Sequence, residues 1–293
     1  MSNENLPQGA NANANAAAAA GSGAVGNDRV KFDGKAAIAS AFADGKAFIP
    51  FVTCGDPDLA TTEELVCAMA DAGASLIELG IPFSDPTAEG PVIQEANLRA
   101  LSGGVTTDDV FDLISRLRRR TQVPLAIMTY ANVVYSYGIE RFCGRMAEVG
   151  VAGLILPDVP FEEKEEFADP CRDAGVVLVS MVAPTSAGRV RMIAEGAEGF
   201  LYCVSSLGVT GMRSSISGDV AGLVQLVREV NPDIPCAIGF GISTPEQAAN
   251  MAAVSDGAIV GSAVVRLVAE HGKNSVQPVR TFVEKMAKAA KGA

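Results

Sequence analysis

The feature of this sequence that most constrains its fold is a repeated alternation between short apolar runs and longer stretches of helical periodicity. Eight apolar runs end in breaks rich in Gly, Pro or Asp, which is typical of buried strands. These runs are Ala47–Thr53, Ser75–Gly80, Pro124–Tyr130, Gly153–Asp158, Val176–Ala183, Gly199–Ser205, Pro235–Gly241 and Gly257–Gly261. Near-continuous apolar strands that alternate with helices indicate a parallel sheet covered on its faces, and eight such units predict a closed (β/α)8 barrel, the TIM-barrel class.

Apolar residues spaced three or four apart predict the helices that separate and follow these strands. The predicted helices are Thr61–Ala72, Val92–Arg120, Ile139–Val149, Phe161–Ala174, Ala187–Glu195, Asp219–Val230, Thr244–Ala253, Ala263–Glu270 and Val276–Lys291. An open doubly wound sheet is the alternative fold. It is disfavoured because the segment after the first strand, Cys54–Asp58, lacks the Gly-rich fingerprint expected there.

The composition divides the chain into a tail and one domain. Residues 1–29 are mostly Asn, Ala and Gly with few apolar anchors, which predicts a disordered tail rather than an export signal. Residues 30–293 form the predicted barrel, which we expect to be the catalytic domain. No apolar run approaches the roughly 18 residues of a membrane span, and a formal net charge of −11 argues against nucleic-acid or anionic-membrane partners.

Cysteine and histidine usage narrows the chemistry. The six cysteines are widely spaced without a Cys-x-x-Cys pair, which favours free thiols in a reducing, cytoplasmic compartment. The single histidine, His271, lies where a helix is expected to end, so the sequence predicts neither a Ser-His triad nor a His-based metal site.

One carboxylate lies inside an apolar strand and is the first candidate for function. Glu78 must find partners or shift its pKa there, because burying a bare charge costs several kcal/mol. The loop that follows holds two more carboxylates, Asp85 and Glu89. The alternative is a structural Glu that faces solvent or pairs with a Lys. In a barrel, catalytic groups lie at the carboxyl ends of the strands, which is where this loop begins.

Glycine-bearing turns follow the last three predicted strands, in Gly208–Gly211, Gly239–Ser243 and Gly261-Ser262. Backbone N–H groups in such turns, aided by a helix N-terminus, can hold a phosphate. Each turn alone is ordinary strand-to-helix geometry, but three in consecutive barrel units favour a phosphate site. Without a strand-end Lys or a metal cluster, the remaining chemistry is general acid–base catalysis by carboxylates on a phosphorylated small molecule.

Seven segments, in order between residues 35 and 288, resemble the tryptophan synthase alpha chain family. They are Pro50–Pro57, Glu78–Pro86, Gly90–Gln94, Met128–Asn132, Pro157–Pro160, Gly208–Gly211 and Gly239–Ser243. The resemblance implies a lyase of tryptophan biosynthesis that cleaves indole-3-glycerol phosphate to indole and glyceraldehyde 3-phosphate by a retro-aldol reaction, without cofactor or metal. It also implies association with a beta chain in an alpha2beta2 heterotetramer that receives the indole.

By the same resemblance, Glu78 is the general acid–base, and Tyr202 lies beside it. Glu89 occupies the position where the family normally has Asp, whose carboxylate stabilises positive charge at the indole nitrogen. The implied phosphate ligands are Gly211, Gly241, Gly261 and Ser262. The implied indole pocket is formed by Phe51, Ile93, Met128, Tyr130 and Phe240, for which ordinary barrel packing is the alternative.

Two other functions compete with this interpretation. Because Glu89 departs from the family pattern, the chain could be a catalytically weakened paralogue that acts mainly as a binding partner of the beta chain. A related phosphate-binding barrel isomerase is the other alternative, although the apolar pocket and the Glu78–Pro86 segment disfavour it.

Overall fold

The computed structural model describes residues 32–204, 216–239 and 241–293. The predicted tail, Gly211, Phe240 and the turn Gly208–Gly211 lie outside these described residues.

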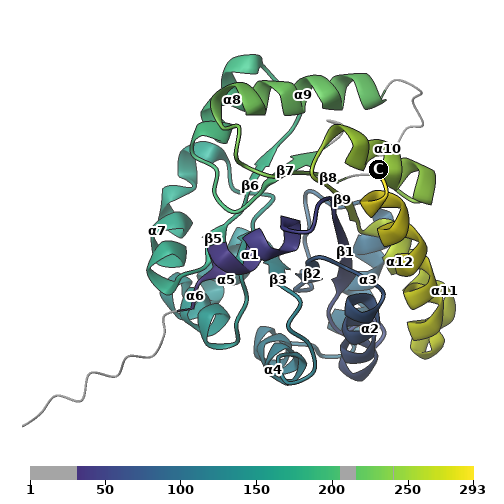
Figure 1. Cartoon of the computed structure of the whole chain (residues 1–293). Helices are drawn as coiled ribbons and strands as arrows, with labels where there is room; N and C mark the ends of the chain where they lie inside the picture. The colour runs from purple at the N-terminus through teal and green to yellow at the C-terminus, as the bar shows by residue number, and fades with distance from the viewer. Residues whose placement is uncertain (1–31, 205–215, 240) are drawn as a thin grey trace, which may run out of the picture. The chain divides into compact units, whose positions relative to one another are not determined.

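The described strands form one parallel sheet with the order β5-β4-β3-β2-β1-β9-β8-β7-β6 (Figure 1). Its two end strands, β5 and β6, are successive pieces of one extended segment separated only by Val179. Because β5 pairs with β4 while β6 pairs with β7, the sheet closes on itself and the predicted barrel is confirmed. The strands are β1 (Ala47–Thr53), β2 (Ile77–Gly80), β3 (Leu125–Met128), β4 (Gly153–Ile155), β5 (Val177–Leu178), β6 (Ser180–Val182), β7 (Leu201–Val204), β8 (Cys236–Gly239) and β9 (Gly257–Val260).

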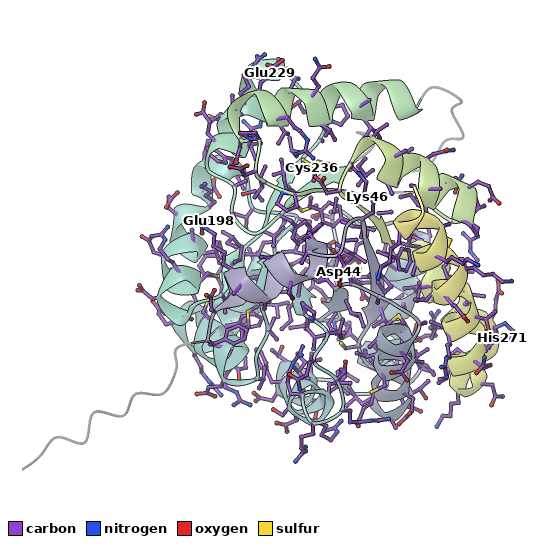
Figure 2. The ribbon with its side chains drawn as sticks, in the orientation of Figure 1. Asp44, Lys46, Glu198, Glu229, Cys236 and His271 are labelled. Carbon is purple, nitrogen blue, oxygen red and sulfur yellow. The ribbon has the colours of Figure 1, made fainter. Side chains whose placement is uncertain are left out.

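Helices surround the strands in Figure 1. The described α-helices are α1 (Gly34–Phe42), α2 (Leu59–Asp71), α3 (Pro91–Ser102), α4 (Thr107–Leu117), α5 (Ala131–Tyr137), α6 (Ile139–Glu148), α7 (Glu165–Ala174), α8 (Ala187–Glu195), α9 (Ile216–Val230), α10 (Pro245–Val254), α11 (Ser262–His271) and α12 (Val276–Lys291). None of the helices in the described part of the chain is long and apolar enough to cross a membrane. His271 ends α11 on the exposed surface, as the sequence predicts (Figure 2).

The helix predictions were wrong in one segment and missed two helices. The single helix predicted over Val92–Arg120 is two helices, α3 and α4, because Gly104 adopts a φ of +80° and Thr106 then begins α4 with a capping box. The sequence analysis also missed α5, and it missed α1 before the first strand.

The strands alternate between an outer face toward the helices and an inner face within the barrel. In β1, for example, Phe48 and Val52 pack in the large cluster that joins the strands to the helices, whereas Ile49 belongs to a separate inner cluster. The inner cluster also contains Ala126 of β3 and Ala237 of β8. Side chains therefore fill the barrel, which leaves its carboxyl end as the place for a site.

Helix α1 packs against the amino-terminal end of the barrel. Its buried Ile38 belongs to the inner cluster, and a Cβ at Gly153 or Gly199 would lie 3.3 or 3.1 Å from the Ile38 Cδ1 atom. At its first residue, Gly34 approaches so closely that a Cβ would lie 2.4 Å from the Ala152 carbonyl oxygen. Only a glycine permits this approach of helix to barrel backbone.

We predict that Gly34→Ala lowers the free energy of unfolding by about 1–3 kcal/mol, because the added methyl overlaps main-chain oxygens that cannot rotate away. The matched control is Gly144→Ala in α6, where no heavy atom lies within 4 Å of the added Cβ. This control should gain about 0.5–1 kcal/mol from helix propensity. Urea denaturation measures both, and equal effects of the two substitutions would contradict the close packing of α1.

Candidate active site

Glu78 lies in the middle of β2 and inside the barrel. It is in register with Phe51 of β1 and with Ala126 of β3, and only 1% of its surface is exposed. Its Oε1 atom has no hydrogen-bond partner among the described residues, so it is neither a solvated strand-end Glu nor half of a described ion pair. Burial raises the pKa of Glu78 to about 8, which keeps the carboxyl group protonated at neutral pH. A buried acid that is neutral near pH 7 can give a proton, and the carboxylate that this leaves can take one.

Tyr202 of β7 is the second titratable group here. Burial, and then the charge of Glu78, hold the pKa of Tyr202 well above its usual value, so its hydroxyl stays protonated. A Cβ at Gly239 of β8 would lie 2.5 Å from the Tyr202 hydroxyl oxygen. Gly239, which the sequence analysis placed in a phosphate turn, therefore makes room for the Tyr202 ring.

An apolar cluster lies beside Glu78 at the same end of the barrel. It contains Phe51, Ile93 and Met128, three residues of the predicted indole pocket, and Ala96 and Val265 complete its buried part. A Cβ at Gly80, two residues beyond Glu78, would lie 2.5 Å from the Phe51 Cζ atom. The Phe51 ring therefore leans over the backbone of β2. Tyr130, another described member of the predicted pocket, stacks its ring on Phe83 with centroids 5.1 Å apart.

Glu89 ends the loop after β2, directly before Gly90 and α3. Its Oε2 atom accepts a 2.8 Å hydrogen bond from the Asn97 side-chain amide, and its carbonyl oxygen accepts a 2.7 Å bond from the Gln94 amide. Burial raises the pKa of Glu89, while hydrogen bonds from Asn97 and Tyr130 lower it in part. The Tyr130 hydroxyl also accepts from the Ala88 backbone N–H at 3.2 Å.

Other carboxylates at this end have structural partners. Both oxygens of Asp56, in the loop after β1, accept 2.8 Å hydrogen bonds from the Arg99 guanidinium on α3, and Asp56 is 2% exposed. Asp158 accepts from the Ala131 backbone N–H and so caps α5. Asp85 is exposed and bonds its neighbour Ser84.

The described part of the predicted phosphate cradle adjoins the apolar cluster. Gly261 precedes α11, which begins at Ser262, and no side chain in the described part of the chain caps this helix. A Cβ on Gly261 would lie 3.6 Å from Phe51 and 3.7 Å from Ile93, so the helix N-terminus borders the pocket. Gly241 has a φ of +75°, and among the described residues no heavy atom lies within 4 Å of an added Cβ. Uncapped N–H groups at a helix N-terminus suit an anion.

Sequence reasoning missed Asn97, which is 3% exposed on the buried face of α3, and Arg99. The signal was available for Asn97, since an amide among the buried residues of an amphipathic helix needs a partner. At the end of β1, the buried hydroxyl of Thr53 has no partner among the described residues.

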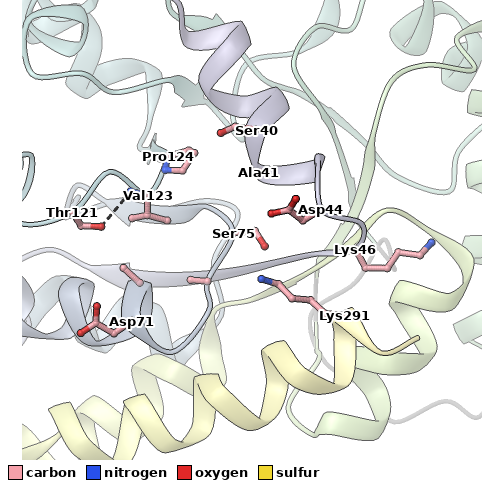
Figure 3. A pocket seen from close by; sticks show the side chains of 12 residues that line it. Ser40, Ala41, Asp44, Lys46, Asp71, Ser75, Thr121, Val123, Pro124 and Lys291 are labelled. Atoms are coloured by element: carbon pink, nitrogen blue, oxygen red, sulfur yellow. Dashed lines mark hydrogen bonds between the residues drawn. The ribbon is translucent and has the colours of Figure 1, made fainter.

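The opposite end of the barrel holds a hollow of about 340 Å³ between α1, α12 and the starts of β1, β2 and β3 (Figure 3). Asp44, Ser75 and Lys291 line it, whereas the Lys46 amine is bonded to the Ser255 carbonyl oxygen at 2.5 Å. In residues 32–204, 216–239 and 241–293, no three His, Cys, Asp or Glu side chains form a group that could hold a metal ion.

Comparison with known proteins adds to this geometry. A sequence model of the family described as tryptophan synthase alpha chain matches residues 39–293. The chain is 48% identical over 246 residues to the tryptophan synthase alpha chain of Alkaliphilus metalliredigens (strain QYMF), with 83% of this chain and 92% of the relative covered. It is 45% identical over 251 residues to that of Lacticaseibacillus casei, with 85% and 93% covered.

Solved structures agree with the sequence comparisons. Tryptophan synthase subunit alpha from Legionella pneumophila str. Paris superposes with a TM-score of 0.79 at 32% identity, covering 88% of this chain and 99% of that one. A chain from the tryptophan synthase α2β2 complex of Pyrococcus furiosus gives 0.76 at 34% identity, covering 83% and 98%.

We predict that Glu78 makes the folded chain less stable as the pH rises. The folded protein keeps the Glu78 proton up to a pKa of about 8, whereas an unfolded Glu loses it near roughly 4.3. Between these values the folded state binds more protons, so this group's contribution to stability is full below about 4.3 and declines up to about 8.

Glu78→Gln replaces the titrating carboxyl group with an amide. The melting temperature of this variant minus that of the parent should therefore increase as the pH is raised from 5 to 8. Calorimetric melting temperatures of both proteins across this range measure the difference. A constant difference would show that the Glu78 carboxyl is not buried in its protonated form.

Proposed function

Because the chain belongs to the tryptophan synthase alpha chain family, we propose that its barrel carries out the cleavage of indole-3-glycerol phosphate at Glu78. The protein is a lyase of tryptophan biosynthesis and partners with a tryptophan synthase beta chain. The observation that carries the site assignment is the isolation of the Glu78 carboxyl. It is buried at the carboxyl end of the barrel and lies beside an apolar cluster that suits an indole ring.

The reaction needs one proton delivered and one removed. Glu78 in its protonated form gives its proton to the ring carbon that bears the glycerol chain. The resulting carboxylate takes the proton of the glycerol hydroxyl as the carbon–carbon bond breaks, which yields indole and glyceraldehyde 3-phosphate and restores the acid. A pKa of about 8 lets one carboxyl serve in both directions near neutral pH.

Glu89 stabilises the charge that this protonation creates. Protonation of the ring carbon leaves positive charge on the ring nitrogen, and a carboxylate that accepts the ring N–H offsets it. Asn97 donates to Oε2, so we assign Oε1 to the ring N–H of the substrate. Tyr202 is a titratable neighbour of the general acid, since the charge of Glu78 is one cause of its raised pKa.

The phosphate group binds at the turns after β7, β8 and β9. Gly241, Gly261 and Ser262 supply backbone N–H groups, and the N-terminus of α11 favours negative charge. Gly211 and Phe240, which lie outside the described residues, stay predicted members of this site. A beta chain docked on this end would receive the indole, and association as an alpha2beta2 tetramer in the cytoplasm remains our prediction for this chain.

We predict that Glu78→Gln reduces indole release by about 10²–10⁴-fold while the binding of a phosphate-bearing substrate analogue survives. The amide keeps the shape of the carboxyl group but cannot carry the proton. The control is Glu284→Gln on the exposed face of α12, which should leave turnover unchanged. Turnover by purified protein, with and without a beta chain, is the measurement, and near-normal cleavage by Glu78→Gln would remove Glu78 from the mechanism.

A further prediction concerns the phosphate. Gly241→Val places a branched side chain at a φ of +75°, which displaces the N–H groups of this turn and should raise KM more than it lowers kcat. Gly104→Val is the matched control, because Gly104 has a φ of +80° and no described heavy atom within 4 Å of an added Cβ, but lies between α3 and α4. Similar KM values for the two variants would place the phosphate elsewhere.

A further inference from the structure

Asn97 is bonded to the carboxylate of Glu89 and is almost fully buried. We propose that Asn97 is a positioning residue, which fixes one oxygen of Glu89 so that the other is aimed at the substrate. The inference rests on the proposed role of Glu89 but adds a residue and a mechanism to it.

The loop around Glu89 is held at three points. Asn97 holds the side chain through a 2.8 Å bond to Oε2, and Gln94 holds the main chain through a 2.7 Å bond to the Glu89 carbonyl oxygen. The Tyr130 hydroxyl accepts from the Ala88 N–H at 3.2 Å. A Glu side chain has three rotatable bonds, so fixing both its main chain and one of its oxygens removes most of its freedom.

Helix α3, which carries Asn97, is itself anchored on both sides. Ala96 packs in the apolar cluster with Phe51, and Arg99 makes two 2.8 Å bonds to the buried Asp56. These anchors tie α3 to β1 and to the loop after it. The Asn97 amide therefore has a defined position relative to the Phe51 pocket. Its hydrogen bond to Glu89 fixes the Glu89 carboxylate relative to the same pocket.

Few charged or titratable groups of the described chain face Glu89, so the pH dependence of activity can test its contact with Asn97. Among the described residues, Asn97 and the Tyr130 hydroxyl face its carboxylate, and Asp158 acts on Tyr130 in turn. Burial raises the pKa of Tyr130 to about 12, so this hydroxyl stays protonated over the range in which enzymes are assayed. A change in the pH profile on altering residue 97 then reports on the contact between residues 89 and 97.

The experiment compares Asn97→Asp with the matched control Asn231→Asp in the intact protein. The Asn231 amide donates a 2.9 Å bond to the Ala194 carbonyl oxygen, away from the site. In Asn97→Asp, two facing carboxylates repel at high pH, and kcat for indole release should fall on the order of 10²-fold with little change in KM. As the pH is lowered, a protonated Asp at position 97 can again donate to Glu89, so the deficit should shrink.

The control should keep the parental pH profile. An Asn97→Asp variant whose kcat and pH profile match the parent would overturn the proposal while leaving the proposed function intact. A parent protein that releases no indole would instead refute the proposed function.

A second measurement tests the contact between Asn97 and Glu89 without measuring catalytic activity. Carbon-13 NMR of labelled glutamate, with Glu89 assigned by its loss in Glu89→Gln, follows the Glu89 titration in the parent and in Asn97→Ala. Loss of the amide donor should raise the pKa of Glu89, because the charged form loses a hydrogen bond. An unchanged pKa in a folded Asn97→Ala protein would refute the positioning role.

Discussion

The burial of one carboxyl group inside an apolar barrel is the constraint on which the site depends. Glu78 has no described partner for Oε1, so its neutral form is the stable one and its neighbours must be apolar or weakly polar. The neighbours of Glu78 inside the barrel include the Phe51 ring on one side and Tyr202 across the barrel. Gly80 and Gly239 leave space for these two rings. The barrel therefore holds the Glu78 carboxyl group in a fixed position that is buried from solvent.

Helix α3 holds in place the functional groups that are carried by loops around Glu78. This helix packs Ala96 against the pocket, holds Glu89 through Asn97 and anchors the β1 loop through Arg99. Loops that carry catalytic groups lose entropy when substrate binds, and prior attachment to a helix reduces that loss. The longer Glu at position 89 is thus held by a partner buried on the scaffold rather than by the loop alone.

Apolar periodicity predicted the eight strands and the place of Glu78, because a parallel strand buried on both faces leaves a continuous signal. The same signal could not separate α3 from α4, whose apolar residues keep helical spacing across Gly103-Gly104. Helix α1 is short and Ala-rich, and its identity depends on contacts with Ala152 and Gly175 that are distant in sequence. The contact between Gly239 and Tyr202 could not be predicted for a similar reason, since only the folded barrel brings the two residues together.

Closure of the sheet has a consequence for how the chain reaches this state. The first strand completes its pairing only with the last, β9, and Gly257 lies so close to Ala47 that a Cβ would meet the Ala47 oxygen at 2.9 Å. Beside this seam, the Lys46 amine is bonded to the Ser255 carbonyl, 209 residues later in the chain. Contacts of such long sequence separation incur a large loop-closure cost before they form and slow folding. While the chain is being synthesised, one edge of β1 therefore stays unpaired until nearly all of the barrel has left the ribosome.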